Sequence, residues 1–129
     1  MEERNPDIRR ALFTHAALVR RYGGAQGLRD QGTLEAALER SWQASFGGER
    51  FPEPHEKAAA LCEAIIRRHP FIDGNKRTGV TLGAYLLWTF GYRLVASQKE
   101  LEDFGVAVAT GKLEQESIAA WFGEHSAPN

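Results

Sequence analysis

Between residues 67 and 80 the sequence reads RRHPFIDGNKRTGV, and it gathers side chains that can move protons and bind anions. The ordinary pKa of a histidine such as His69 suits a general base near neutral pH. Asp73 offers a carboxylate of the kind that Mg²⁺ binds together with substrate phosphates. Lys76 and Arg77 add positive charge. A base, a metal ligand and two cations within nine residues predict a site for phosphoryl or nucleotidyl transfer.

The two cations fall in the first turn of a predicted helix, where the helix dipole is already positive and acidic residues are favoured. An anion bound to the free backbone N–H groups would make Lys76 and Arg77 favourable there. Gly74 would let the backbone approach that anion, and Asn75 would add side-chain donors. The alternative is that both cations are only solvated and that Asp73 caps the helix. The nearby histidine favours a phosphate-binding site.

Apolar periodicity and end signals predict the elements that must position this segment. Helices are predicted over residues 6–22, 33–46, 54–68, 76–91, 98–111 and 114–123. Residues 92–97, YRLVAS, predict a short strand or an extended link. The sequence therefore predicts an all-α fold: a compact bundle of about six helices in a single domain, residues 1–129, with at most one small β-hairpin.

Local signals indicate where these helices begin and pack. The expected N-caps are Asn5, Thr33 and Ser97, the last of them in a capping box. The helix over 76–91 is apolar nearly all round, which is typical of a central helix. Gly79 and Gly83 lie four residues apart on it. They predict a smooth stripe where a second helix can come close.

Composition limits the function. The chain has 129 residues, 43% of them hydrophobic and 26% charged, which suits one folded core. Its 16 basic and 17 acidic residues give a net charge of −1, which argues against a nucleic-acid partner. The one cysteine, Cys62, is in an apolar stretch and is expected to be buried. No apolar stretch of about 18 residues or signal region is found, so we expect a cytoplasmic protein without a membrane partner.

Residues 69–79, HPFIDGNKRTG, resemble the Fic/Doc family signature, His-x-Phe-x-(Asp/Glu)-(Gly/Ala)-Asn-(Gly/Lys)-Arg. Residues 20–38, RRYGGAQGLRDQGTLEAAL, resemble the early segment of the death-on-curing (Doc) members of that family. The late segment ATGKL, residues 109–113, also fits Doc. The resemblance covers nearly the whole chain and implies the all-α Fic fold, with the signature running from a loop into a central helix.

The resemblance also implies roles for individual residues, with ATP and Mg²⁺ as cofactors. His69 would be the base that deprotonates a target hydroxyl, Phe71 a buried anchor of the loop, and Asp73 the ligand of Mg²⁺. The residues implied to bind the nucleotide phosphates are Gly74, Asn75, Lys76 and Arg77. His15, on the apolar face of the first predicted helix, is expected to be a satisfied core histidine. Arg68 is expected to be an exposed residue at a helix end.

Two departures from the adenylylating Fic pattern bear on the reaction. That pattern has Gly in place of Lys76 and a second Arg in place of Val80. Both departures resemble Doc, whose members transfer the terminal phosphate of ATP, whereas Gly74 matches Fic. The resemblance favours an ATP-dependent protein phosphotransferase acting on a Ser or Thr hydroxyl of a translation factor, with elongation factor Tu as the suggested target. One alternative is transfer of AMP; a further one is a helical binding module without turnover.

The resemblance implies regulation by a partner. Two segments begin the family's inhibitory-helix pattern, (Ser/Thr)-x-x-x-Glu-(Gly/Asn), and neither completes it. A Doc-like protein is the toxin of a toxin–antitoxin pair, restrained by an antitoxin segment that folds on binding into an apolar groove. Candidates to line that groove are Trp42, Phe46, Trp121 and Phe122, with core packing as the alternative for each.

Overall fold

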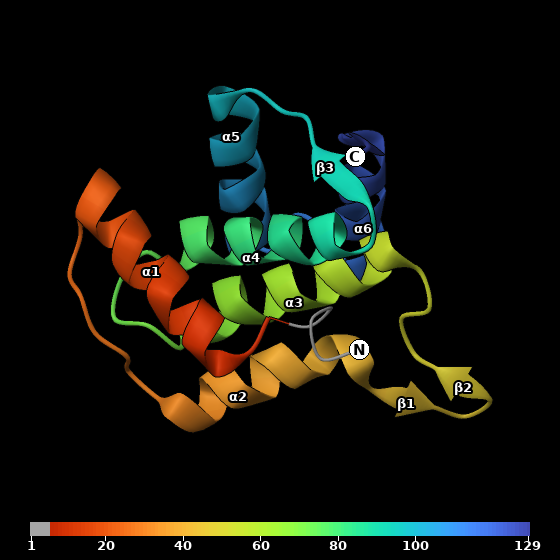
Figure 1. Ribbon diagram of the computed structural model, residues 1–129, viewed down its shortest axis with the longest axis horizontal. Helices are drawn as coiled ribbons and strands as arrows, with labels where there is room; N and C mark the ends of the chain where they lie inside the picture. Colours follow the sequence, from red (N-terminus) through yellow and green to blue (C-terminus); the bar gives the residue numbers. More distant parts are fainter. Residues whose placement is uncertain (1–5) are drawn as a thin grey trace.

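Two helices that run in opposite directions, α3 (Pro54–Arg68) and α4 (Asn75–Thr89), occupy the centre of the computed structural model, which describes residues 6–129 (Figure 1). Around them lie α1 (Ile8–Tyr22), α2 (Gln31–Glu39), α5 (Gln98–Ala109) and α6 (Gln115–Glu124). A 3₁₀ turn, η2 (Arg40–Trp42), continues α2. In Figure 1, α2 lies below the central pair, and α5 and α6 lie above it. The predicted all-α bundle of about six helices is confirmed.

The central pair is tightly packed because α3 is apolar on nearly every side. Residues 58–62 of α3 are all fully buried, so this helix must be covered from several directions. The stripe of Gly79 and Gly83 on α4 faces it. A Cβ atom added to Gly79 would lie 3.0 Å from the backbone oxygen of Cys62, and one added to Gly83 would lie 3.2 Å from that of Ala58. The predicted close approach of a second helix is confirmed.

The first two helices are capped by aspartates. The carboxylate of Asp7 accepts a hydrogen bond from the backbone N–H of Arg10 (2.8 Å) at the start of α1; the predicted cap, Asn5, lies outside the described residues. The prediction that Thr33 caps the second helix is wrong. Asp30 caps it instead, since its side chain accepts from the N–H groups of Gly32 (3.0 Å) and Thr33 (3.4 Å). The cap of this helix therefore lies three residues earlier than predicted.

The predicted capping box at the start of α5 is confirmed. The backbone N–H of Glu100 donates to the Ser97 hydroxyl (3.1 Å), and the N–H of Ser97 donates to the Glu100 carboxylate (2.8 Å). These bonds and the nearby His125 hold the pKa of the Glu100 carboxyl below its ordinary value. Cys62 is buried as expected. Among the described helices, none is long and apolar enough to cross a bilayer.

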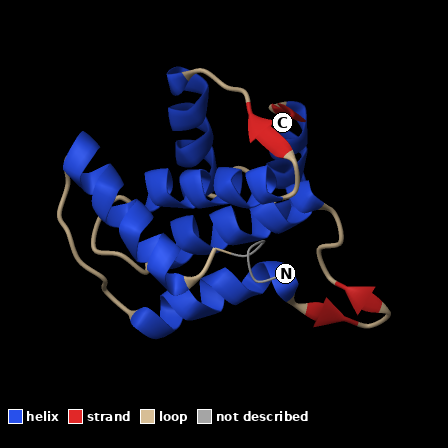
Figure 2. Cartoon of the chain, in the orientation of Figure 1, coloured by secondary structure: helices blue, strands red, loops and turns tan. Residues whose placement is uncertain are grey.

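Within residues 6–129, four short strands form two small antiparallel sheets, one more than the single hairpin that was predicted (Figure 2). Their bounds are β1 (Ala44–Ser45), β2 (Gly48–Glu49), β3 (Tyr92–Leu94) and β4 (Ser126–Pro128). The strand predicted after the central helix is β3, and it pairs with β4. The β1–β2 hairpin replaces the end of the predicted second helix. Lys57 ties that hairpin to α3, because its buried ammonium donates to the Glu49 carboxylate (2.6 Å) and to the backbone oxygen of Phe51.

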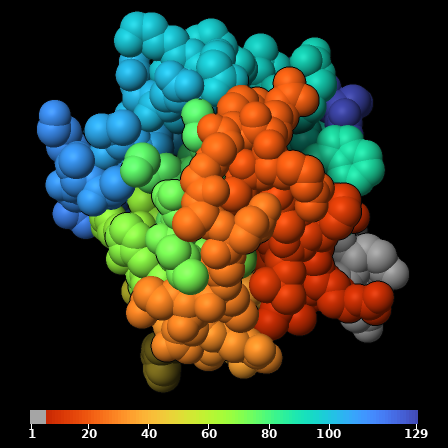
Figure 3. Space-filling model, turned by 90° about the vertical axis from the view of Figure 1, so that its left-hand side faces the viewer, coloured from red at the N-terminus to blue at the C-terminus, as the bar shows by residue number. Residues whose placement is uncertain are grey.

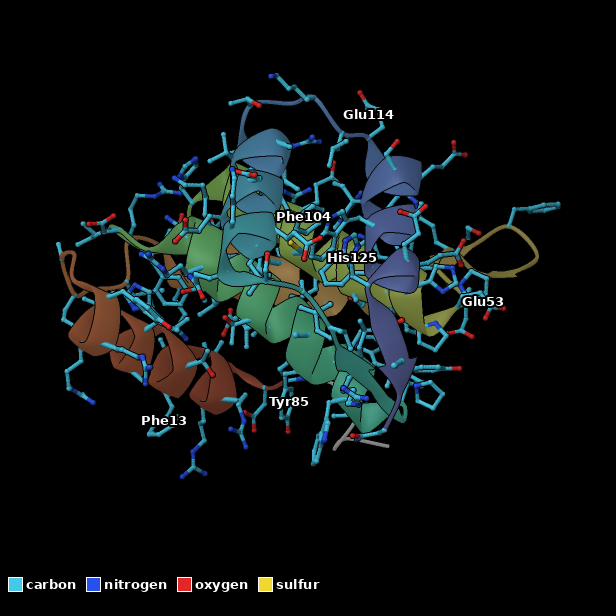
Figure 4. All side chains as sticks on the ribbon, turned by 90° about the horizontal axis from the view of Figure 1, so that it is seen from above. Phe13, Glu53, Tyr85, Phe104, Glu114 and His125 are labelled. Atoms are coloured by element: carbon cyan, nitrogen blue, oxygen red, sulfur yellow. The ribbon has the colours of Figure 1, made fainter. Side chains whose placement is uncertain are left out.

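The four aromatic residues expected to line one groove do not form one surface. Phe122 is fully buried in the core. Trp121 stacks on Phe104 with ring centroids 3.8 Å apart and on His125 at 4.1 Å. Figure 4 labels Phe104 and His125, the two partners of this stack. Trp42 packs near the Lys57 ammonium, and Phe46 is fully exposed in the β1–β2 hairpin. Trp121 and Phe122 pack edge to face, with ring centroids 5.6 Å apart. Because Phe122 is buried and Phe46 is fully exposed, the four side chains do not line one groove, and the alternative of core packing is confirmed for Phe122.

Candidate active site

The loop between α3 and α4 starts with a histidine in an unusual backbone conformation. His69 ends α3 with φ 53° and ψ 60°, and it is the one non-glycine residue with a positive φ in the described part of the chain. A left-handed residue with a Cβ atom costs about 1–2 kcal/mol, so neighbouring groups must hold it. Its backbone N–H donates to the oxygen of Ile65 (3.2 Å). The His69 side chain is exposed.

Phe71 and Asn75 fix the middle of this loop. Phe71 is 1% exposed, and its ring stacks on His15 with centroids 3.8 Å apart and planes 7° apart. The Asn75 side chain is also buried: its oxygen accepts from the N–H of Phe71 (3.1 Å), and its amide donates to the Phe71 oxygen (2.9 Å). The side-chain donor that was expected to face an anion is thus bonded to the loop. Asn75 presents its backbone N–H there instead.

Asp73 is held at three atoms, two of them by groups far away in the sequence. One carboxylate oxygen accepts from the N–H of Ala25 (3.1 Å) and the other from the N–H of Gly74 (2.9 Å). These bonds, led by that of Ala25, hold the pKa of the Asp73 carboxyl below its ordinary value. The Nε2–H of His15 donates to the backbone oxygen of Asp73 (2.7 Å). His15 is the satisfied, buried histidine that was expected, and its partner belongs to the signature loop.

The loop between α1 and α2 lies along the signature loop. The N–H of Ile72 donates to the oxygen of Gly27 (3.0 Å), Leu28 and Phe71 form an antiparallel bridge, and the N–H of Arg29 donates to the oxygen of Pro70 (2.7 Å). Figure 3 shows this α1–α2 segment, in orange, against the light-green atoms of the α3–α4 loop. The contact joins residues about 40 positions apart, so it was not visible in local sequence patterns.

The start of α4 is open to an anion. Its N-cap is Gly74, at φ 77°, and no described side chain caps the helix. The backbone N–H groups of Asn75, Lys76 and Arg77 are the first in the helix and have no intrahelical acceptor. Free N–H groups at the positive end of a helix dipole bind phosphate and carboxylate groups. The two exposed cations of this first turn add to that attraction.

A pocket of about 380 Å³ lies at this helix start, between α1 and α5. Its polar lining comes from residues 73–77, Gln98 and Glu102, and its apolar lining includes Leu18, Tyr22, Val80, Leu101 and Val106. The pocket brings together the predicted metal ligand and the four predicted phosphate-binding residues. His69 is not among its lining residues in the described chain. The site thus has a cationic end and an apolar end.

Arg77 crosses one side of this pocket. Its guanidinium lies 4.4 Å from the centre of the Tyr22 ring and 4.0 Å from a carboxylate oxygen of Glu102. Both charged side chains are about half exposed, so the ion pair is weak. Tyr22 and Glu102 were not singled out in the sequence. Tyr22 lies in the segment that resembles Doc, whereas no pattern places Glu102 opposite the signature.

Asp73 is the described residue best placed to hold a divalent metal at this site. Each of its carboxylate oxygens accepts one N–H and keeps a lone pair for a metal. No group of three or more metal-ligating side chains is found in residues 6–129. Mg²⁺ often binds through one or two carboxylates together with substrate phosphates. A single ionised Asp73 beside a phosphate-binding helix start fits that mode.

The sequence of this chain is similar to those of known proteins. Residues 6–87 match the family model described as the Fic/DOC family. The chain is 37% identical over 101 residues to Toxin Doc of Mycolicibacterium smegmatis, which covers 77% of this chain and 78% of that protein. It is 36% identical over 108 residues to Protein kinase doc of Escherichia phage P1, which covers 84% of each. The chain therefore belongs to the Fic/Doc family.

Proposed function

We propose that this protein is a Doc-like toxin that transfers the terminal phosphate of ATP to a Ser or Thr hydroxyl of a translation factor, with elongation factor Tu as the first target to test. The observation that carries the proposal is the open start of α4, where free N–H groups, Lys76 and Arg77 adjoin a pocket of about 380 Å³. The names Toxin Doc and Protein kinase doc of two relatives support the toxin role and the phosphotransfer.

In this proposal each group of the signature has one task. The N–H groups of residues 75–77 and the two cations bind the phosphates, which positions the nucleotide and stabilises the charge of the transition state. Mg²⁺, held by Asp73 and the phosphates, would neutralise negative charge on the nucleotide. The target oxygen bonds to the terminal phosphorus as ADP leaves, and His69 accepts the proton of the hydroxyl.

Transfer of phosphate is favoured over transfer of AMP by the position of Lys76. A Cβ atom added to Gly105 of α5 would lie 3.5 Å from the Cβ of Lys76, so the lysine stem lies against α5 at the edge of the pocket. Glycine at this position would leave the helix start open to a further phosphate group. The nucleotide therefore binds in a different pose from that of the adenylylating members.

The protein would act in the cytoplasm and be restrained by a cognate antitoxin. The relatives named as Doc toxins support such a partner. The segment of the antitoxin that folds on binding needs a surface other than the groove of four aromatic residues, because that groove is absent from the described structure. Co-expression with the neighbouring gene product and co-purification through a tag would identify the partner.

Intact-mass spectrometry tests the reaction. Elongation factor Tu is incubated with Mg-ATP and the protein, beside a His69→Ala control. A His69-dependent gain of about 80 Da is expected, because the terminal phosphate is transferred; AMP would add about 329 Da. A gain of AMP would contradict the phosphotransfer and assign adenylylation. No gain with either protein would reject this target, and a lysate with labelled ATP would then separate another substrate from a binding module without turnover.

A further inference from the structure

One arginine binds three consecutive carbonyl groups at the end of α3. The Arg29 guanidinium donates from Nη2 to the oxygen of Arg68 (2.7 Å) and from Nε to the oxygen of His69 (2.5 Å). Its backbone N–H donates to the oxygen of Pro70 (2.7 Å). The last carbonyls of a helix have no intrahelical partner, so Arg29 completes the C-terminus of α3.

The two side-chain bonds span the residue that carries the predicted base. The carbonyl groups of Arg68 and His69 belong to the peptide planes before and after the His69 Cα atom. Their relative orientation depends only on φ and ψ of His69, which are 53° and 60°. A guanidinium is a rigid planar fork with donors in fixed directions. It can bind both oxygens only while His69 stays near this left-handed conformation.

The guanidinium is not what attaches the two loops to each other. The backbone N–H groups of Arg29 and Asp30 both donate to the oxygen of Pro70 (2.7 and 3.1 Å), and the N–H of Ile72 donates to Gly27 (3.0 Å). These bonds involve main-chain atoms only, so they survive replacement of the Arg29 side chain. The side chain therefore acts on the conformation of His69 rather than on the docking of the loop.

We propose that Arg29 is a positioning residue: its forked guanidinium holds the main chain of His69 in the left-handed conformation that presents the imidazole to the target hydroxyl. The inference rests on the proposed function in one respect, the role of His69 as the base. Arg29 lies outside the signature, and the residues whose oxygens it binds, Arg68, His69 and Pro70, are not among those that line the pocket.

The deciding variant is Arg29→Lys, which keeps the charge and loses the fork, since an ammonium is a point donor. The expected result is a kcat lowered by about 10- to 100-fold, because small displacements of a reacting group have effects of this size. The KM for ATP should stay within about twofold, since the phosphate-binding helix start is unchanged. The matched control is Arg67→Lys. Arg67 also bridges two carbonyls, those of Val108 (3.1 Å) and Leu113, and neither belongs to the signature loop.

Backbone chemical shifts of His69 give a second readout that needs no turnover. In Arg29→Lys they should move away from left-handed values, and in Arg67→Lys they should not. Unchanged shifts, an unchanged kcat, or equal losses of kcat in both variants would each overturn the inference. If the wild-type protein phosphorylates nothing, the proposed function fails separately, and the His69 shifts still decide whether Arg29 holds this conformation.

Discussion

The substitution Gly79→Ala tests how closely the two central helices approach. A Cβ atom at this position would lie 2.7 Å from Cγ1 of Ile66 and 3.0 Å from the backbone oxygen of Cys62. Alanine in a helix interior is favoured over glycine by about 1 kcal/mol. Overpacking a core costs about 1–3 kcal/mol, and the upper part of that range applies because one neighbour is backbone, which cannot change rotamer.

The two effects leave a net loss of about 1–2 kcal/mol in the free energy of unfolding. An unfolding entropy of about 2.1 cal/mol/K per residue over 129 residues converts this loss into a Tm lower by about 4–8 °C. Thermal and urea unfolding followed by far-UV circular dichroism measure both quantities.

Gly105→Ala is the matched control, since it is a helix-interior glycine without the crowding. The nearest atom to its added Cβ is the Cβ of Lys76 at 3.5 Å, an ordinary contact. Here the helix preference of alanine prevails, so the Tm should rise by about 2–4 °C. If Gly79→Ala stabilises the protein as much as Gly105→Ala does, the close packing of α3 on α4 and the reasoning from it are refuted.

Three further results are expected. Glu102→Gln should lower the Kd for ATP, measured by calorimetry, by about two- to fivefold, because it releases Arg77 from an exposed ion pair. High salt should reduce the difference between the two proteins. A weaker affinity of the variant would show that Glu102 itself supports binding. Because folding lowers the pKa of Asp73, its ionised carboxyl stabilises the folded protein at pH values above the ordinary pKa near 3.8. This stabilisation is lost as the pH falls through the lowered pKa of the folded protein. Urea unfolding of Asp73→Asn should therefore vary less with pH below about 4, and equal slopes in both proteins would argue against the two amide bonds. Burial raises the pKa of the Cys62 thiol, so Ellman's reagent should react with it only after unfolding; rapid reaction in native buffer would contradict its burial.

Local patterns predicted what depends on neighbouring residues. The apolar periodicity located all six helices of the described chain, and the two glycines of α4 indicated its close contact. Residues 73–77, which were expected to bind metal and phosphate, line one pocket. Where two good caps stood close together, as Asp30 and Thr33 do, the pattern favoured the wrong one. Both could serve the same turn, and the hydrogen bonds decided between them.

Pairings between distant segments could not be predicted from one sequence. His15 bonds to Asp73 across 58 positions, and Arg29 to His69 across 40. The Asn75 side chain was expected to face a ligand, but it turns to Phe71 because the buried loop needs its polar backbone groups satisfied. Trp121 and Phe122 both pack on Phe104, but Phe122 is fully buried and Trp121 only partly buried. A sequence pattern predicts which face of a helix is apolar, but the fold determines which residues contact that face.

The positions of the two pocket walls in the sequence determine when the pocket can form during synthesis. One wall is α1 and the other is α5, so the lining extends from Leu18 to Val106 although the signature ends at Gly79. A ribosome that has released the chain only as far as α4 has released the whole signature and nine of the 14 residues that line the pocket. Such a nascent chain should pair α3 with α4 and yet bind ATP poorly. Activity would then begin only when α5 has folded against α4, late in synthesis.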